Sequence, residues 1–244
     1  GLSNYYKKNL ILIPYNELEK TKKILEKFKK NLNCIIVEPI QASLPYENVK
    51  SYLSYLEIFC KKNNCILIFD EMITGLRTDC YSVQKYFKIK PDISIFGKCF
   101  GAGFPIGIIS INKRVSKKLI KIKQKVFFGG TFSGNSVITF IGNEVLKYIF
   151  KNKKKIFSRI NNNAKYFELE LNEFFKKSNL DLKIYRFKSM MRLVYSKKLI
   201  LDRASRDFFE IEKNNKIFKF KKYIKNQNIN MPDNGIMFIS LAHE

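Results

Sequence analysis

The chain has 244 residues, of which 45% are hydrophobic and 14% aromatic, so it can bury the core of one large domain or two small ones. No apolar run approaches the roughly 18 residues that a transmembrane helix needs, so we expect no membrane partner. The net charge is +25, but the lysines are spread along the predicted helices and no nucleic-acid motif is present. We therefore expect no nucleic-acid partner.

The first hundred residues predict short apolar strands that alternate with helices. In chain order the elements are a helix over 15–30 with Asn16 as its N-cap, a strand over 34–37, a helix over 46–62, a strand over 66–69, a helix or turn through Tyr81 and Tyr86, and a strand over 93–96. The strands are apolar throughout, which is typical of a parallel sheet buried on both faces by helices. The sequence therefore predicts an α/β fold.

The second half of the chain is more charged. A further helix is predicted over 137–150, and the basic run Lys151–Lys155 resembles a junction. We expect residues 1–150 to form part of a large domain and residues 151–244 to form a small C-terminal α/β domain. Because the chain starts at Gly1 and its last residues carry no helix cap, we also expect the natural protein to be longer.

The sequence has five cysteines and one histidine. The cysteine spacing matches no zinc pattern, and His243 alone cannot form a histidine-rich site, so we expect no bound metal. Most of the cysteines lie in or beside apolar stretches, which favours reduced core thiols in a cytoplasmic protein. They are Cys34, Cys60, Cys65, Cys80 and Cys99.

An ionisable residue stands at the end of each predicted strand. Glu38, Asp70 and Lys98 follow the three strands in turn. Ligands of open parallel sheets bind at the carboxyl ends of the strands, so the topology predicts that the three groups converge. The apolar flanks of Lys98 are expected to desolvate its amine, which makes a lysine a better nucleophile.

These residues suit the cofactor pyridoxal 5′-phosphate (PLP). Its aldehyde needs a lysine, for which Lys98 is the candidate, and its ring nitrogen needs a carboxylate, for which Asp70 is the candidate. Its phosphate needs hydroxyls and unhindered amides, which the segment 129–135 offers. Taken singly, each signal also fits a helix cap, a surface lysine or an ordinary loop. Only their order and separation together are specific.

Four segments resemble the successive motifs of class III aminotransferases, with the glutamate-1-semialdehyde aminomutase-like branch as the nearest. They are IIVEPI (35–40), LIFDEMITGLR (67–77), DISIFGKCFGAGFPIG (92–107) and GGTFSGN (129–135). The resemblance implies the fold-type I architecture of PLP enzymes and a homodimer. It implies that Lys98 forms a Schiff base with the cofactor, that Asp70 pairs with the ring nitrogen, and that Met72 packs behind the ring, where the family usually has Val. Gly130 and Thr131 would then bind the cofactor phosphate, usually that of the neighbouring subunit.

Departures from the family pattern leave the reaction open. The stretch 41–45 replaces a glycine-rich segment, and the family's N-terminal phosphate turn and stacking aromatic are absent from the chain. The stretch 230–244 resembles the family's C-terminal segment, in which the position of the aminomutase glutamate falls near Gly235. We therefore favour transamination between an amino donor and a carbonyl acceptor, with an aminomutase and an inactive truncated protein as alternatives. Arg192 suits either a substrate carboxylate or an ordinary salt bridge.

Overall fold

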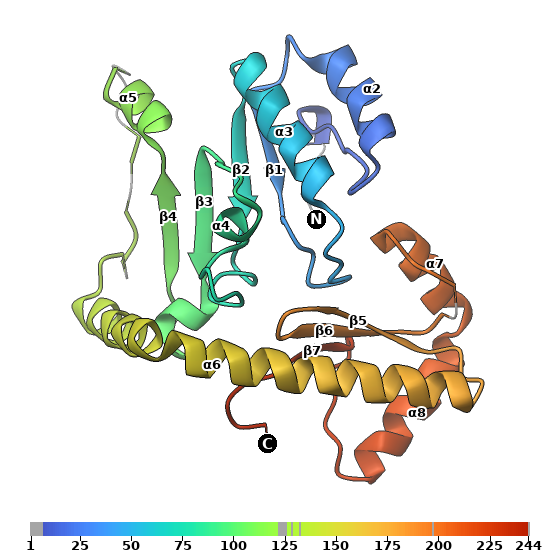
Figure 1. Cartoon of the computed structure of the whole chain (residues 1–244). Coiled ribbons are helices and arrows are strands. Elements are labelled where there is room, and N and C mark those ends of the chain that lie inside the picture. Colours follow the sequence, from blue (N-terminus) through green and yellow to red (C-terminus); the bar gives the residue numbers. More distant parts are fainter. Residues whose placement is uncertain (1–6, 122–125, 128, 132, 197, 244) are drawn as a thin grey trace.

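The computed structural model describes residues 7–121, 126–127, 129–131, 133–196 and 198–243. They form a four-stranded sheet of order β1-β2-β3-β4 and a three-stranded sheet of order β5-β6-β7. The long helix α6 runs below the first sheet and in front of the second (Figure 1). Within the described ranges, no helix combines the length and the apolar character needed to cross a membrane.

The first sheet is mostly parallel, as the sequence predicts. Strands β1 (Cys34–Val37), β2 (Ile66–Asp70) and β3 (Ile93–Gly97) run parallel, and β4 (Gly107–Ile111) is antiparallel to β3. Strands β2 and β3 are each one residue longer than predicted, so Asp70 and Gly97 belong to the strands that they end. The predicted α/β class is confirmed.

Helices α2 (Leu18–Phe28) and α3 (Lys50–Lys62) cover one face of this sheet (Figure 1). Both are shorter than the predicted helices, and Asn16 is not the N-cap of α2. Asn16 has a φ of 60° in a turn that Glu17 closes by donating its N–H to the carbonyl of Pro14, and Glu17 precedes the helix without a capping side chain. Asparagine tolerates this left-handed conformation, so the turn chemistry prevails over helix capping.

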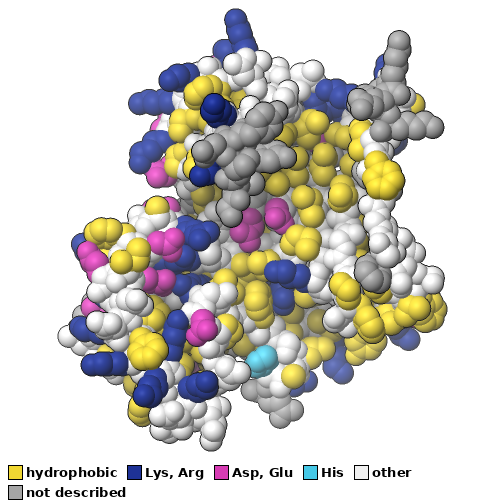
Figure 2. Space-filling model, turned by 180° about the vertical axis from the view of Figure 1, so that it is seen from behind, with side chains coloured by type: hydrophobic (Ala, Val, Ile, Leu, Met, Phe, Trp, Pro, Cys, Tyr) yellow, Lys and Arg dark blue, Asp and Glu magenta, His cyan; other side chains and the backbone are white. Residues whose placement is uncertain are grey.

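The other face of the sheet is partly open among the described residues. Burial alternates along β1 and β2, and the side chains of Ile36 and Ile109 are 60% and 61% exposed. Seen from behind, hydrophobic side chains gather over the upper half of the molecule (Figure 2). The expected burial of the strands on both faces is therefore wrong here, because α2 and α3 pack against one face while the strands are apolar on both.

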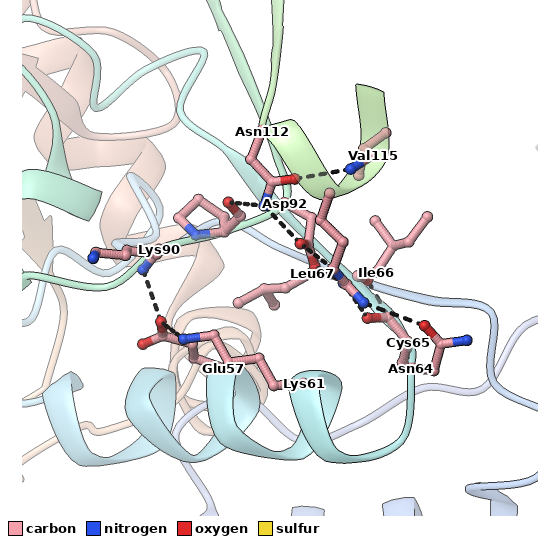
Figure 3. A network of polar contacts seen from close by, with 12 residues as sticks. Glu57, Lys61, Asn64, Cys65, Ile66, Leu67, Lys90, Asp92, Asn112 and Val115 are labelled. Carbon is pink, nitrogen blue, oxygen red and sulfur yellow. Dashed lines mark hydrogen bonds and ion pairs between the residues drawn. The ribbon is translucent and has the colours of Figure 1, made fainter. Parts of the chain in front are cut away.

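A buried polar network joins the strands at the edge away from the candidate site (Figure 3). Asp92, which is 6% exposed, accepts hydrogen bonds from the Leu67 N–H (2.9 Å), the Asn112 amide (2.7 Å) and the Arg114 Nε (2.8 Å). Arg114 also donates to the carbonyl of Cys65 (2.8 Å). Burial by itself would raise the pKa of Asp92, but the hydrogen bonds outweigh burial and hold this pKa below its usual value.

Three shorter helices follow or flank the strands of the first sheet. Helix α4 (Val83–Phe87) packs beside β2 and β3, the 3₁₀ helix η1 (Lys98–Gly101) follows β3, and α5 (Lys113–Lys121) follows β4. Of the cysteines, Cys60 and Cys65 are buried as predicted, whereas Cys34 is exposed at the start of β1. All five are free thiols. Among the described residues, no group of three or more potential metal ligands occurs.

Helix α6 (Ser136–Lys177) is 42 residues long. The Asn135 side chain caps it by accepting the Ile138 N–H (3.1 Å). The basic run Lys151–Lys155 lies inside this helix, so its interpretation as a junction is wrong. Lysine is a good helix former, and a run of solvated lysines does not by itself end a helix. The division into domains 1–150 and 151–244 stays a prediction.

The second sheet is antiparallel and packs on α6. It contains β5 (Lys183–Phe187), β6 (Met190–Val194) and β7 (Ile236–Phe238), and the helices α7 (Arg203–Glu212) and α8 (Asn214–Asn226) connect β6 to β7. Phe157 and Ile160 of α6 share a core with Met191 and Leu193 of β6. Other residues of this sheet pack into the core of the first half, where Phe187 contacts the rings of Tyr86 and Phe87 of α4.

Candidate active site

Three ionisable side chains meet at the carboxyl edge of the parallel strands. Glu38 directly follows β1, Asp70 ends β2, and Lys98 directly follows β3. Burial raises the pKa of Glu38, the nearby Asp70 carboxylate raises it further, and the Lys98 amine and a backbone hydrogen bond lower it. Because β1, β2 and β3 are parallel neighbours in register, the residues at their carboxyl ends stand at the same edge of the sheet. The structure brings them together as the topology predicts.

Lys98 has an unusual backbone. It begins η1 directly after β3 with a φ of 51°, which lies in the left-handed region. A residue with a Cβ adopts this conformation only at a cost, and nine other described non-glycine residues, among them Lys88, share it. The side chain is exposed, contrary to the desolvated setting expected from its apolar neighbours. Its amine makes no hydrogen bond or ion pair with a described residue, so it is available to a ligand.

Asp70 is half-buried, and the turn that follows it fixes one of its oxygens. The Oδ1 atom accepts the Met72 N–H at 3.0 Å. No donor from the part of the chain that the structure describes reaches Oδ2, so this oxygen can accept a hydrogen bond from a ligand. The side chains of Phe69 and Glu71, its neighbours in the sequence, are fully buried, whereas Asp70 itself is half-buried.

Met72 packs against the backbone that leads into Lys98. A Cβ placed on Gly97 would lie 2.5 Å from the Met72 Cε and 2.9 Å from its sulfur. Only glycine at position 97 allows the thioether to lie this close to the end of β3. Met72 therefore lies between the last residue of β2 and the last residue of β3, as expected for a side chain that supports a bound ring.

Gly130 and Thr131 lie at a different hollow. Both are exposed, and they line a cavity of about 670 Å³ together with the segments 105–108 and 133–135 and the first residues of α6. Neither Asp70 nor Lys98 lines this cavity. The structure therefore does not bring Gly130 and Thr131 to the same pocket as the two strand-end residues.

Arg192 is buried in β6 and forms an ion pair with Glu210 of α7, in which NH2 lies 2.7 Å from Oε2. Burial lowers the pKa of Arg192, and the neighbouring Glu210 carboxylate raises it. The salt-bridge alternative is thus confirmed for this arginine. Its guanidinium lies against Gly235, which has a φ of 66°, and a Cβ on Gly235 would be 2.2 Å from the Arg192 NH1.

Sequence reasoning missed Glu71, which directly follows Asp70. Its side chain is fully buried, and its carboxylate accepts hydrogen bonds from two backbone N–H groups of α4 and from the Thr74 hydroxyl. The available signal was a second carboxylate inside an otherwise apolar motif, because a buried carboxylate needs donors nearby. The two backbone donors are twelve and thirteen residues away, so their identity depended on the fold.

The described residues fit PLP. An uncommitted amine, a carboxylate with one open oxygen and a thioether lie at adjacent strand ends, which matches the needs of its aldehyde, ring nitrogen and ring face. A sequence model of the family described as "Aminotransferase class-III" matches residues 6–191. The matched range includes Asp70, Met72, Lys98, Gly130 and Thr131, whereas Arg192, Glu210 and Gly235 lie outside it.

Curated relatives agree with this match. The glutamate-1-semialdehyde 2,1-aminomutase of Thermosipho africanus is 30% identical over 249 residues, which cover 100% of this chain and 56% of the relative. That of Methanocaldococcus jannaschii is 34% identical over 224 residues, which cover 91% of this chain and 50% of the relative. The chain spans about half the length of these relatives.

A solved structure supports the fold. A β-phenylalanine aminotransferase from Variovorax paradoxus matches 95% of this chain and 53% of its own chain, with a TM-score of 0.82 and 18% identity. The similarity shows that the chain has the architecture of fold-type I PLP transferases. The chain belongs to the class III aminotransferase family, whose members depend on PLP.

Proposed function

We propose that the protein carrying this chain is a PLP-dependent aminotransferase that moves an amino group from a small amino donor to a carbonyl acceptor. The observation that carries this proposal is the meeting of Asp70 and Lys98 at neighbouring parallel strand ends, with the Lys98 backbone in the left-handed region. When bound, PLP would act as the electron sink for carbanion chemistry at the substrate.

Three residues of this chain would each have a different role in the reaction. Lys98 supplies an exposed amine that attaches the cofactor covalently and can then carry a proton within the site. Asp70 offers its open Oδ2 to the ring nitrogen and keeps it protonated, an ion pair that is strong in partly buried surroundings. Met72 limits the position of the ring by packing at the end of β3.

The alternative is an aminomutase, which moves the amino group within one substrate. The names of the two sequence relatives favour it. The residue at position 235 favours transamination, because Gly235 offers no carboxylate near the place of the aminomutase glutamate. An aminomutase that used a glutamate at this position would need Arg192 elsewhere. Turnover of the carbonyl acceptor that depends on a separate amino donor would distinguish the two reactions.

We further propose that the active form is a homodimer in which Gly130 and Thr131 bind the cofactor phosphate of the partner subunit. Their exposure and their separation from the strand-end residues support this arrangement. Hydrophobic side chains nearby are also exposed, among them Phe127 at 85% and Phe140 at 66%. The five free thiols support a cytoplasmic location.

The dimer is tested by sedimentation of the PLP-loaded natural polypeptide that carries this chain. We expect a dimer, and Thr131→Ala should weaken PLP binding about tenfold by removing one phosphate contact, without changing the sedimentation. A fully active monomer would refute the shared site.

Covalent labelling tests Lys98. Borohydride reduction of the PLP-loaded polypeptide should attach the cofactor to the peptide that contains Lys98, and Lys88, which also follows a short element with a positive φ, serves as the matched control. Label on another lysine with Lys98 unmodified would refute the assignment. Absence of any PLP binding would instead favour an inactive protein.

Substitution tests Asp70. Asp70→Asn keeps the size of the side chain but removes its charge, so transamination is expected to fall about 10³-fold while PLP binding weakens less. Turnover close to that of the wild type would show that Asp70 has another role.

A further inference from the structure

Glu71 is a buried carboxylate to which the proposed chemistry gives no role. Its side chain is 0% exposed. Its Oε2 accepts hydrogen bonds from the Val83 N–H (2.6 Å) and the Thr74 hydroxyl (3.1 Å), and its Oε1 accepts the Gln84 N–H (3.1 Å). Three donors hold this side chain in one orientation.

The bonds of Glu71 tie the turn after β2 to both α4 and β3. Its own N–H donates to the carbonyl of Ile95 in β3 (2.9 Å), and its carbonyl accepts the Gly75 N–H (2.9 Å). The Gln84 amide, at the start of α4, donates to the Ser94 hydroxyl of β3 (3.0 Å). One connected set of hydrogen bonds therefore holds the turn and the strand that leads to the candidate lysine.

Asp70 receives this constraint through Met72. The Met72 N–H lies inside the turn and donates to the Asp70 Oδ1 at 3.0 Å, so the plane of the carboxylate follows the position of the turn. Pairing with a ring nitrogen requires the other oxygen to point at the ring. A displacement of about 1 Å can cost about 10²-fold in rate when a reacting group depends on such an orientation.

Glu71 caps the first two N–H groups of α4, but capping accounts for only part of its bonding, because it also accepts the Thr74 hydroxyl. Helix α4 already has an N-cap in Ser82, whose hydroxyl accepts the Lys85 N–H. Burial raises the pKa of Glu71, and the hydrogen bonds from Val83 and Gln84 lower it. A neutral residue would avoid this desolvation cost, so a buried carboxyl group at this position indicates a requirement beyond local stability.

We propose that Glu71 is a positioning residue that holds the Asp70 carboxylate in the orientation required to pair with the ring nitrogen of PLP. It touches neither the cofactor nor the substrate and acts through the turn formed by residues 71–75. The inference rests on the function proposed above for Asp70 and Lys98.

The test uses the complete natural polypeptide that carries this chain, loaded with PLP. Glu71→Gln keeps the shape of the side chain but replaces one carboxylate oxygen by an NH₂ group. This donor would face the N–H groups of α4, which need an acceptor. The matched control is Asp92→Asn, which neutralises another buried carboxylate with backbone and side-chain donors at the opposite edge of the same strands (Figure 3). Thr74→Val removes only one bond to Glu71 and serves if Glu71→Gln fails to fold.

Three quantities are measured: thermal unfolding, the pH midpoint of the visible absorbance of the bound cofactor, and kcat. We expect both buried-carboxylate variants to unfold at lower temperature. Glu71→Gln should also shift the absorbance midpoint by about one pH unit and lower kcat about 10²-fold, whereas Asp92→Asn should change neither. Thr74→Val should give a smaller shift in the same direction as Glu71→Gln.

A double-mutant cycle assigns the effect to Asp70. If Glu71 acts through Asp70, then Asp70→Asn combined with Glu71→Gln should lose no more activity than Asp70→Asn alone. Multiplicative losses, or a Glu71→Gln variant that only unfolds more easily, would overturn the positioning role and leave the proposed function intact. A wild-type polypeptide that shows no cofactor absorbance would overturn the proposed function and this inference with it.

Discussion

Lys98→Gly is expected to stabilise the protein relative to Lys98→Ala. Both variants lose the amine, but only glycine adopts a φ of 51° without strain. A left-handed conformation costs a residue with a Cβ roughly 1–2 kcal/mol. The greater freedom of glycine in the unfolded chain offsets about 0.4–1 kcal/mol of that gain. Taking the middle of each range, the net difference in the free energy of unfolding should be about 0.8 kcal/mol.

Urea and thermal unfolding without PLP measure this difference, because cofactor binding then contributes nothing. For a chain of this length, 1 kcal/mol corresponds to about 2–4 °C in the unfolding midpoint. Lys88, exposed at the C-cap of α4 with a φ of 60°, is the positive control, and Lys88→Gly should exceed Lys88→Ala by a similar amount. The argument for a strained backbone at position 98 would be refuted if Lys98→Gly and Lys98→Ala were equally stable while Lys88→Gly was more stable than Lys88→Ala.

Two further predictions concern stability. Asp92→Asn should lower the free energy of unfolding by about 3 kcal/mol at pH 7, because Arg114 stays charged and loses its partner. Since the folded-state pKa of Asp92 is lowered, its contribution is present above the unfolded value near 3.8 and is lost as pH falls through the folded value. The urea midpoints of mutant and wild type should therefore converge in acid, and a difference independent of pH would contradict the argument. Gly235→Ala should lower the free energy of unfolding by about 2 kcal/mol or more. The new Cβ would lie 2.2 Å from the Arg192 NH1, and the φ of 66° at this position strains any residue with a Cβ. An unfolding midpoint equal to that of the wild type would show that Arg192 moves freely.

The order of chemistry-bearing segments was readable from the sequence, and with it the family and the fold class. The apolar strands, the helices between them and the residues that follow each strand are local features with short periods. Parallel pairing then places the carboxyl ends together, so Glu38, Asp70 and Lys98 could be predicted to meet before any contact was known. The sequence could not decide whether Arg192 binds a substrate carboxylate or forms a salt bridge. Its partner Glu210 lies eighteen residues away in another element, so the ion pair is not a local feature.

Only the tertiary structure decided features that depend on contacts between distant segments. The left-handed backbone of Lys98 results from how β3 meets the following 3₁₀ helix, and the burial of Glu71 results from donors on α4. Helix α6 continues through the basic run because packing on the second sheet stabilises its other side, which a charge pattern cannot reveal. The sequence by itself determined which groups can do chemistry, and the long-range packing of the chain decided how they are held.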